Sequence, residues 1–304
     1  NVANSTPRIQ QVFNQWKNYD PNALKSNLHK NQELKYALLE ETPWVFAADN
    51  EAEQKRNVGL LFDLNRMSNE LERARDKMAE RQLNNGGFAW FAGDRDNWYI
   101  TQYIVEGMGH LRLLGVKAAK EDAKIGDMMQ KAVEYTDNQL AKHYDDLLDW
   151  AKRDKNVKLE DDHLDNIAIH YLYARSFYLS QPVDGKKAKE AIEYYEGQAK
   201  KYWLKKSQYS QGMLALAFHR KGDKDLPAKI VRALKENSLN SEEMGMYWKY
   251  AAGYNWYEMP IETHALMIEV FAEVANDMTA VDDLKTWLLK NKQTTHWATT
   301  KATA

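Results

Sequence analysis

Two kinds of helical segment alternate along this chain, and the alternation restricts the folds that it can adopt. The first kind is amphipathic, as in the segment that begins near Glu51, where apolar residues recur every three or four positions among charged ones. These apolar positions are Leu60, Leu64, Met67, Leu71, Ala74 and Met78. The second kind is apolar on most sides, as in Tyr99–Leu114. A helix of the second kind has to be buried on more than one face.

The alternation continues to the end of the sequence. One-faced, charged helices are predicted at residues 125–152, 186–203, 226–236 and 281–291. The more apolar or aromatic helices between them are predicted at residues 165–179, 210–220 and 261–274. An inner layer of apolar helices and an outer layer of amphipathic ones is the simplest packing that accommodates both kinds. The sequence therefore predicts an all-α fold, an (α/α) toroid of helical hairpins in two concentric layers.

A weak internal repeat agrees with this arrangement, because several inner helices open with a small polar residue after an aromatic loop. The openings lie at residues 98–101, 208–210, 257–263 and 296–300. The last opening is reached just before Ala304. We therefore expect a toroid that is incomplete at one or both ends, in which residues 1–304 form a single helical domain of a larger multidomain protein.

The composition excludes several classes of protein. The 42 Lys and Arg residues nearly balance the 44 Asp and Glu residues, so no general attraction to nucleic acid is expected. No apolar run reaches the roughly 20 residues of a transmembrane helix. The sequence contains no cysteine, which excludes disulfides, thiolate metal ligands and a cysteine nucleophile within it.

The loops before the inner helices are predicted to meet at one end of the toroid, where helix N-termini carry partial positive charge. The longest, Asn84–Trp98, combines glycines with large aromatic residues that either plug the core or line a mouth. Residues 247–258 read in the same way. The candidate binding residues at this mouth are Phe88, Trp90, Phe91, Asp96, Asn97, Trp98, Thr101, Trp256, Tyr257, Glu258, Glu262, Thr263, His296 and Trp297.

No metal or catalytic site is predicted, and no cofactor is expected. His163 and His170 are seven residues apart, but no carboxylate at ligand spacing completes a metal site, so both are interpreted as core or surface histidines. The acidic pairs at 145–146, 161–162 and 282–283 lie on charged segments and are interpreted as solvated faces or helix starts. The acidic residues placed near the mouth are Asp94, Asp96, Glu258 and Glu262, for which helix capping is the favoured role.

Three segments, in order, resemble the thioester domain of alpha-2-macroglobulin-like proteins, especially bacterial ones. Gln82–Phe91, followed by Tyr99–Val105, resembles that family's glutamine and glycine-rich aromatic turn before a threonine-opened helix. Ile261–Leu266 resembles its late "E-T-x-A-L" helix, and residues 287–304 resemble its closing "W-x-S/T-T-x-x-T-A" element. The same turn also resembles that of terpene cyclases and prenyltransferases, which share the toroid shape.

The resemblance implies a module of a periplasmic or cell-surface protein that traps proteases or other targets, without turnover. It implies those targets and the neighbouring domains of the same protein as partners. In that family a Cys-x-Glu-Gln segment forms an internal thioester, which a nucleophile of the target attacks. This sequence has no cysteine and cannot form that bond, so we expect the segment to lie upstream; loss of the thioester is the rival explanation.

Two enzyme hypotheses remain as alternatives. Ten Trp and 17 Tyr residues could stack sugars in a toroid cleft, as in a glycoside hydrolase or polysaccharide lyase. That hypothesis predicts paired carboxylates in an open groove, with Asp96 and Glu262 as candidates. An isoprenoid enzyme would need acidic metal ligands in the central cavity, and the absence of cysteine removes the zinc thiolate typical of prenyltransferases.

Overall fold

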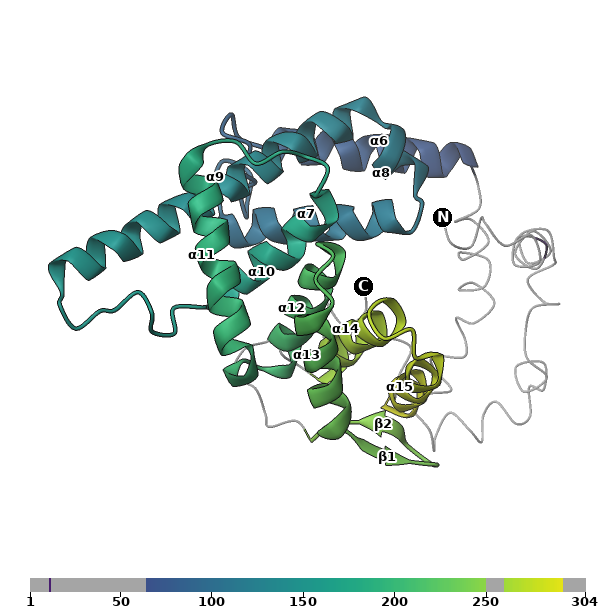
Figure 1. Cartoon of the computed structure of the whole chain (residues 1–304). Helices are drawn as coiled ribbons and strands as arrows, with labels where there is room; N and C mark the ends of the chain where they lie inside the picture. Colours follow the sequence, from purple (N-terminus) through teal and green to yellow (C-terminus); the bar gives the residue numbers. More distant parts are fainter. Residues whose placement is uncertain (1–10, 12–63, 250–259, 292–304) are drawn as a thin grey trace, which may run out of the picture. The chain divides into compact units, whose positions relative to one another are not determined.

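A computed structural model describes residue 11, residues 64–249 and residues 260–291 of the chain (Figure 1). The chain divides into two compact units, residues 1–81 and 82–304. In the first unit, α6 (Leu64–Arg81) lies within the amphipathic segment predicted from Glu51 onward. The second unit is described below by itself. The prediction of a single domain over residues 1–304 stays a prediction.

The second unit is mostly helical, which confirms the predicted all-α class. Its longer helices are α7 (Trp98–Leu113), α9 (Ala123–Arg153), α10 (Asn166–Arg175), α11 (Lys186–Tyr202), α12 (Gln208–Arg220), α13 (Asp225–Glu236), α14 (Pro260–Glu273) and α15 (Met278–Asn291). Shorter elements are α8 (Lys117–Glu121), η2 (Ser176–Tyr178), η3 (Trp203–Lys205), β1 (Leu239–Ser241) and β2 (Gly245–Tyr247). Each longer helix overlaps a segment predicted from apolar periodicity.

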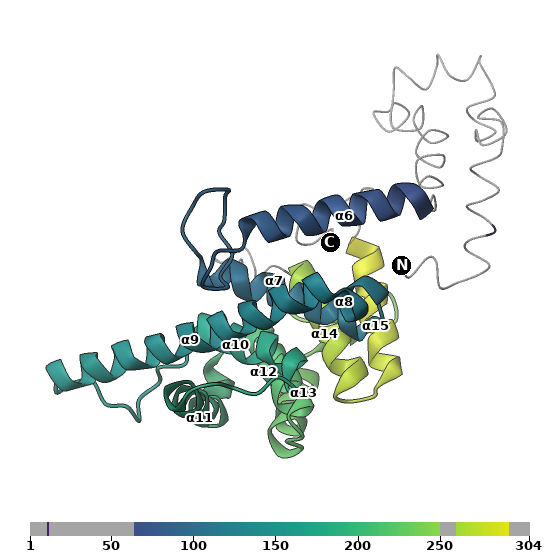
Figure 2. The ribbon, with the colours of Figure 1, turned by 90° about the horizontal axis from the view of Figure 1, so that it is seen from above.

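The helices pack as two sets. The apolar helices contact one another in sequence order: α10 packs against α7 and α12, and α12 also packs against α14 (Figures 1 and 2). Each of the amphipathic helices α9, α13 and α15 packs against the apolar helix that precedes it, and α11 packs against α9 and α10. The apolar set therefore occupies the interior of this unit, as its hydrophobic character requires.

Polar residues just before the helices determine where they begin. The side chains of Asn97, Asp165 and Ser207 accept hydrogen bonds from backbone N–H groups in the first turns of α7, α10 and α12. At the other ends, Gly115 and Gly222 follow α7 and α12 and adopt positive φ of 75° and 89°, the left-handed conformation in which glycine commonly ends a helix. Local chemistry at both ends thus accounts for the helix boundaries.

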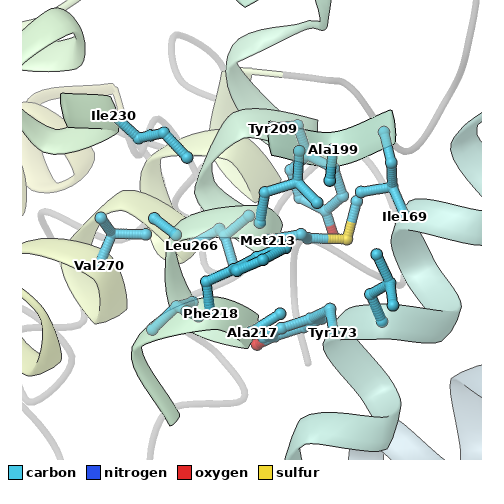
Figure 3. Packing of buried hydrophobic residues seen from close by; sticks show 14 of the residues in the cluster. Ile169, Tyr173, Ala199, Tyr209, Met213, Ala217, Phe218, Ile230, Leu266 and Val270 are labelled. Atoms are coloured by element: carbon cyan, nitrogen blue, oxygen red, sulfur yellow. The ribbon is translucent and has the colours of Figure 1, made fainter. Parts of the chain in front are cut away.

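The core lies where the inner helices meet. Figure 3 shows Ile169 of α10, Met213 of α12 and Leu266 of α14 converging within it. The largest fully buried side chains include Trp248, Tyr171, Tyr173, Tyr195 and Phe271. Tyrosines place hydroxyl groups among these apolar side chains, and buried hydroxyls need hydrogen-bond partners.

The β-hairpin was not predicted. Residues 239–247 form two short antiparallel strands, and β2 packs against α15. A Cβ on Gly245 would lie 2.1 Å from the backbone oxygen of Asp283, so only glycine permits this close approach. Trp248, just after β2, is 2% exposed and donates from Nε1 to the carbonyl oxygen of Leu234. Trp248 therefore plugs the core.

Within the ranges that the structure describes, no helix has both the length and the hydrophobicity of a membrane span.

Candidate functional site

A hydrogen bond and close backbone packing hold the glycine-rich turn before α7 against α9. The side-chain amide of Gln82 donates to the carbonyl oxygens of Gly86 and Met128, at 3.0 and 2.8 Å. A Cβ on Gly86, whose φ is +86°, would lie 2.3 Å from the backbone oxygen of Lys131. The turn requires glycine at this position because its backbone lies against a neighbouring helix.

Thr101 connects the end of the turn to the first turn of α7. Its hydroxyl accepts a hydrogen bond from the Phe88 N–H, at 2.9 Å, and donates one to the Asn97 carbonyl oxygen, at 2.8 Å. Asn97 is the N-cap of α7. Thr101 and Phe88 are 0% and 1% exposed, so of the predicted mouth residues these two and Asn97 support the loop structurally.

The loop presents two other aromatic residues to solvent. Trp90 and Phe91 are 46% and 67% exposed, and their ring centroids are 6.4 Å apart. Trp98 is half-buried and packs edge-on against His143. Asp96 accepts a hydrogen bond from the Tyr135 hydroxyl at 2.6 Å, and this bond outweighs the opposing effect of burial and lowers the pKa of Asp96. Within this one loop, Phe88 therefore plugs the core, whereas Trp90 and Phe91 lie at the surface.

The remaining candidates fall at residues 256–263 and 296–297 of the sequence. Glu262 and Thr263 are buried in the first turn of α14. The other candidates, Trp256, Tyr257, Glu258, His296 and Trp297, lie outside the described residues.

A cavity of about 100 Å³ lies at the N-terminal ends of α10 and α12 and beside α7. It is lined by Tyr99, Tyr103, Glu106, Asn166, Ile167, His170, Tyr209, Ser210 and Met213. The lining residues belong to three inner helices whose first turns were predicted to meet at the mouth. None of the nine was among the predicted site residues.

A short polar contact in this cavity joins α7 to α10. His170 Nε2 lies 2.6 Å from Glu106 Oε2, and His110 Nε2 lies 3.8 Å from Glu106 Oε1. Burial raises the pKa of Glu106, but the contacts with His110 and His170 outweigh it and lower that pKa to about 2. Burial lowers the pKa of His110, but Glu106 and Glu269 outweigh this effect and raise it. Glu106 is therefore ionised at neutral pH.

The charged contacts continue through the centre of the inner helices. His110 Nδ1 lies 3.8 Å from Glu269 Oε1, so α7 and α14 are joined directly. Arg220 donates to Glu269 at 2.6 Å and to Glu273 at 2.7 Å, and its guanidinium carbon lies 4.0 Å from the Phe177 ring centroid. The four inner helices thus share an interior that contains paired charges as well as apolar side chains.

The sequence contains one feature that indicates this buried network of charges. Glu106 is the only acidic residue in α7, which is otherwise largely apolar. A single carboxylate in an apolar helix needs a partner when it is buried. Its partner His170 was interpreted as a core or surface histidine, and it is in the core, 7% exposed.

The other histidine and the acidic pairs lie at the surface. His163 Nε2 lies 2.9 Å from the Lys158 carbonyl oxygen, in a loop. The acidic pairs form ion pairs with lysines: Asp145 with Lys187, Asp162 with Lys206, and Asp282 with Lys285. In the described part of the chain, no group of three or more potential ligands is arranged to hold a metal ion.

No model of a known protein family matches this sequence, and no curated protein matches it.

Proposed function

We propose that this chain is a thioester-domain-like module of an alpha-2-macroglobulin-type protein that traps proteases. The loop at residues 84–98 carries the proposal. This loop contains the glycine-rich aromatic turn of the first resembling segment, it is held at the start of an inner helix by Gln82 and Thr101, and it exposes Trp90 and Phe91. Exposed neighbouring aromatic residues on a supported loop suit contact with another domain or a target.

The helix packing supports a toroid as the architecture of this module. The helices α7, α10, α12 and α14 are neighbours in turn, and the His110–Glu269 contact joins the first to the last. Amphipathic helices pack on this inner set. Two-layer burial of this kind is what an (α/α) toroid requires. In this proposal the parent protein is periplasmic or on the cell surface.

The trapping activity can be tested on the parent protein with its natural flanking domains. After incubation with a protease, a trapped enzyme should still cleave a small chromogenic peptide but lose most activity on casein, because the trap blocks large substrates. Equal cleavage of casein with and without the parent protein would contradict the proposal. An unrelated enzyme domain encoded upstream, where Cys-x-Glu-Gln is expected, would also contradict it.

The role of the loop needs its own variant. The double change Trp90→Ser and Phe91→Ser should reduce trapping while the helical circular dichroism and thermal unfolding of the protein stay unchanged. Leu204→Ser is the matched control, because Leu204 is as exposed as Phe91, at 67%, but lies on η3. Equal trapping by the double variant and the control would show that the loop does not contribute to trapping.

A carbohydrate-active enzyme is the second candidate, and the cavity lined by tyrosines and Glu106 is the observation that favours it. Neither Asp96 nor Glu262 lines this cavity, but Glu262 is close enough to contribute to the raised pKa of Tyr103 and Tyr209, which do line it. Glu262→Gln is therefore the sharper variant: it should abolish release of new reducing ends or unsaturated sugars from a glycan library. Absence of such products with the unmodified chain would exclude this candidate.

A further inference from the structure

Three tyrosine rings form walls of the cavity beside α7. Tyr99 and Tyr103 are one helical turn apart, with ring centroids separated by 6.4 Å and planes inclined by 21°. Tyr209 enters from α12. Tyr103 is 37% exposed and Tyr209 is 7% exposed, so Tyr103 belongs to the rim and Tyr209 to the floor. The faces of tyrosine rings carry negative electrostatic potential.

Two carboxylates influence the tyrosines of this cavity electrostatically. Glu106 lines the cavity together with its partner His170, whose Nε2 lies 2.6 Å from Oε2, and the Glu106 side chain is only 14% exposed. The tyrosine faces therefore supply most of the attraction for a cation, and Glu106 adds to it. Burial, followed by the negative charges of Glu106 and Glu262, raises the pKa of Tyr103. The pKa of Tyr209 is raised by burial first, and Glu106 and Glu262 contribute in the same direction. Both carboxylates are therefore close enough to influence the tyrosines.

The helix N-termini around the cavity do not make it favour an anion over a cation. Free N–H groups at a helix start attract anions. Here the side chains of Asn97, Asp165 and Ser207 already accept hydrogen bonds from first-turn N–H groups of the three lining helices. These caps use part of the donor capacity that an anion would need.

We propose that the cavity between Tyr99, Tyr103 and Tyr209, with Glu106 in its wall, binds the ammonium group of an organic cation. The ligand class is a primary or methylated amine, supplied either by a free small molecule or by a lysine side chain of a protein. This assignment is independent of the trapping function.

The size and chemistry of the cavity suit this ligand. Aromatic rings around a cation attract it through their quadrupoles, and a nearby carboxylate adds to the attraction. At about 100 Å³, the cavity is smaller than the ~150 Å³ cavity that accommodates benzene, so it fits an ammonium group with its adjoining carbons.

The first experiment compares matched ligands on the 304-residue chain by NMR titration. Choline and 3,3-dimethylbutan-1-ol have nearly the same shape, but only choline is charged. We expect choline to bind about fivefold or more tightly than the alcohol. Butylammonium and a lysine-containing peptide with an acetylated N-terminus distinguish the two sources. The same peptide with norleucine in place of lysine is the neutral control. Binding of only the free amines assigns a small-molecule ligand, and preferential binding of the lysine peptide assigns a protein ligand.

The second experiment changes the rim. Tyr103→Leu should weaken choline binding about fivefold or more, whereas Tyr103→Phe should retain it because the ring face remains. Tyr202→Leu, on α11 and not in the lining of the cavity, is the control for replacing tyrosine. Thermal unfolding of each variant checks that the fold is intact.

Two results would overturn the assignment. One is equal affinity for choline and its uncharged analogue, or stronger binding of acetate or phosphate than of any cation. The other is choline affinity that is unchanged in a folded Tyr103→Leu variant.

Discussion

His170 of α10 and Glu106 of α7 are in contact at 2.6 Å, 64 residues apart in the sequence. Their side chains are 9% and 14% exposed, so the pair is largely removed from water. Burial of ions is costly unless each has a partner, and here each charge or hydrogen-bonding group has one. The contact therefore links the position of one inner helix to that of the next.

Removal of the carboxylate should destabilise the fold. Glu106→Gln keeps the size of the side chain but removes the charge that His110 and His170 contact, so we expect a loss of about 1.5–3 kcal/mol in unfolding free energy. Urea denaturation followed by circular dichroism measures this loss. The exposed Glu236→Gln is the control and should change the stability by less than about 0.5 kcal/mol. Equal stability of the two variants would show that the pair contributes little.

His264 should make the fold sensitive to acid. Burial lowers the pKa of His264 to about 4 from its ordinary value of 6.5, and it stacks on Trp287 with ring centroids 3.8 Å apart. The unfolded chain protonates His264 at a higher pH than the folded chain does. The stability that neutral His264 contributes is therefore complete above pH 6.5 and is lost as the pH falls towards 4. The loss is roughly 3 kcal/mol. Unfolding of the unmodified chain and of His264→Phe should be compared between pH 7 and 4. An equal dependence on pH in both proteins would contradict this prediction.

Two glycines on α7 should respond oppositely to alanine. A Cβ on Gly109 would lie 2.4 Å from the ring of Phe177, so Gly109→Ala should destabilise the fold by about 1–3 kcal/mol through overpacking. Gly107 is exposed and its added Cβ would meet nothing within 4 Å. Gly107→Ala should therefore stabilise the helix by about 0.5–1 kcal/mol. Melting temperatures that shift in the same direction for both variants would show that the packing around Gly109 is looser than described.

Thr101 should control the order of the loop at residues 84–98. Thr101→Val keeps the shape but removes the hydroxyl that accepts the Phe88 N–H, and a buried donor without a partner costs about 1–3 kcal/mol. Amide hydrogen exchange at Phe88 should accelerate more than in the remaining helices. Thr286→Val is the control, because the Thr286 hydroxyl makes an exposed hydrogen bond on α15, and it should leave exchange at Phe88 unchanged. Unchanged protection of Phe88 in the Thr101 variant would assign the order of the loop to other contacts.

The sequence by itself determined the helices of the second unit, because apolar periodicity and capping residues act over one or two turns. The segment predicted at 226–236 is α13 at Asp225–Glu236, and the segment predicted at 186–203 contains α11 at Lys186–Tyr202. The short hairpin was missed, since it depends on the contact of Gly245 with Asp283 from a later helix.

Only the tertiary structure decided which polar residues meet. The sequence placed Glu262 and Thr101 near the mouth, but it could not bring Glu106 to His170 or Tyr209 to Tyr103, because these residues lie on separate helices. Their proximity depends on the order and rotation of packed helices, which arise from the burial of whole apolar faces and not from any local pattern. The periodicity of the chain therefore specified the helices, and their packing created the cavity.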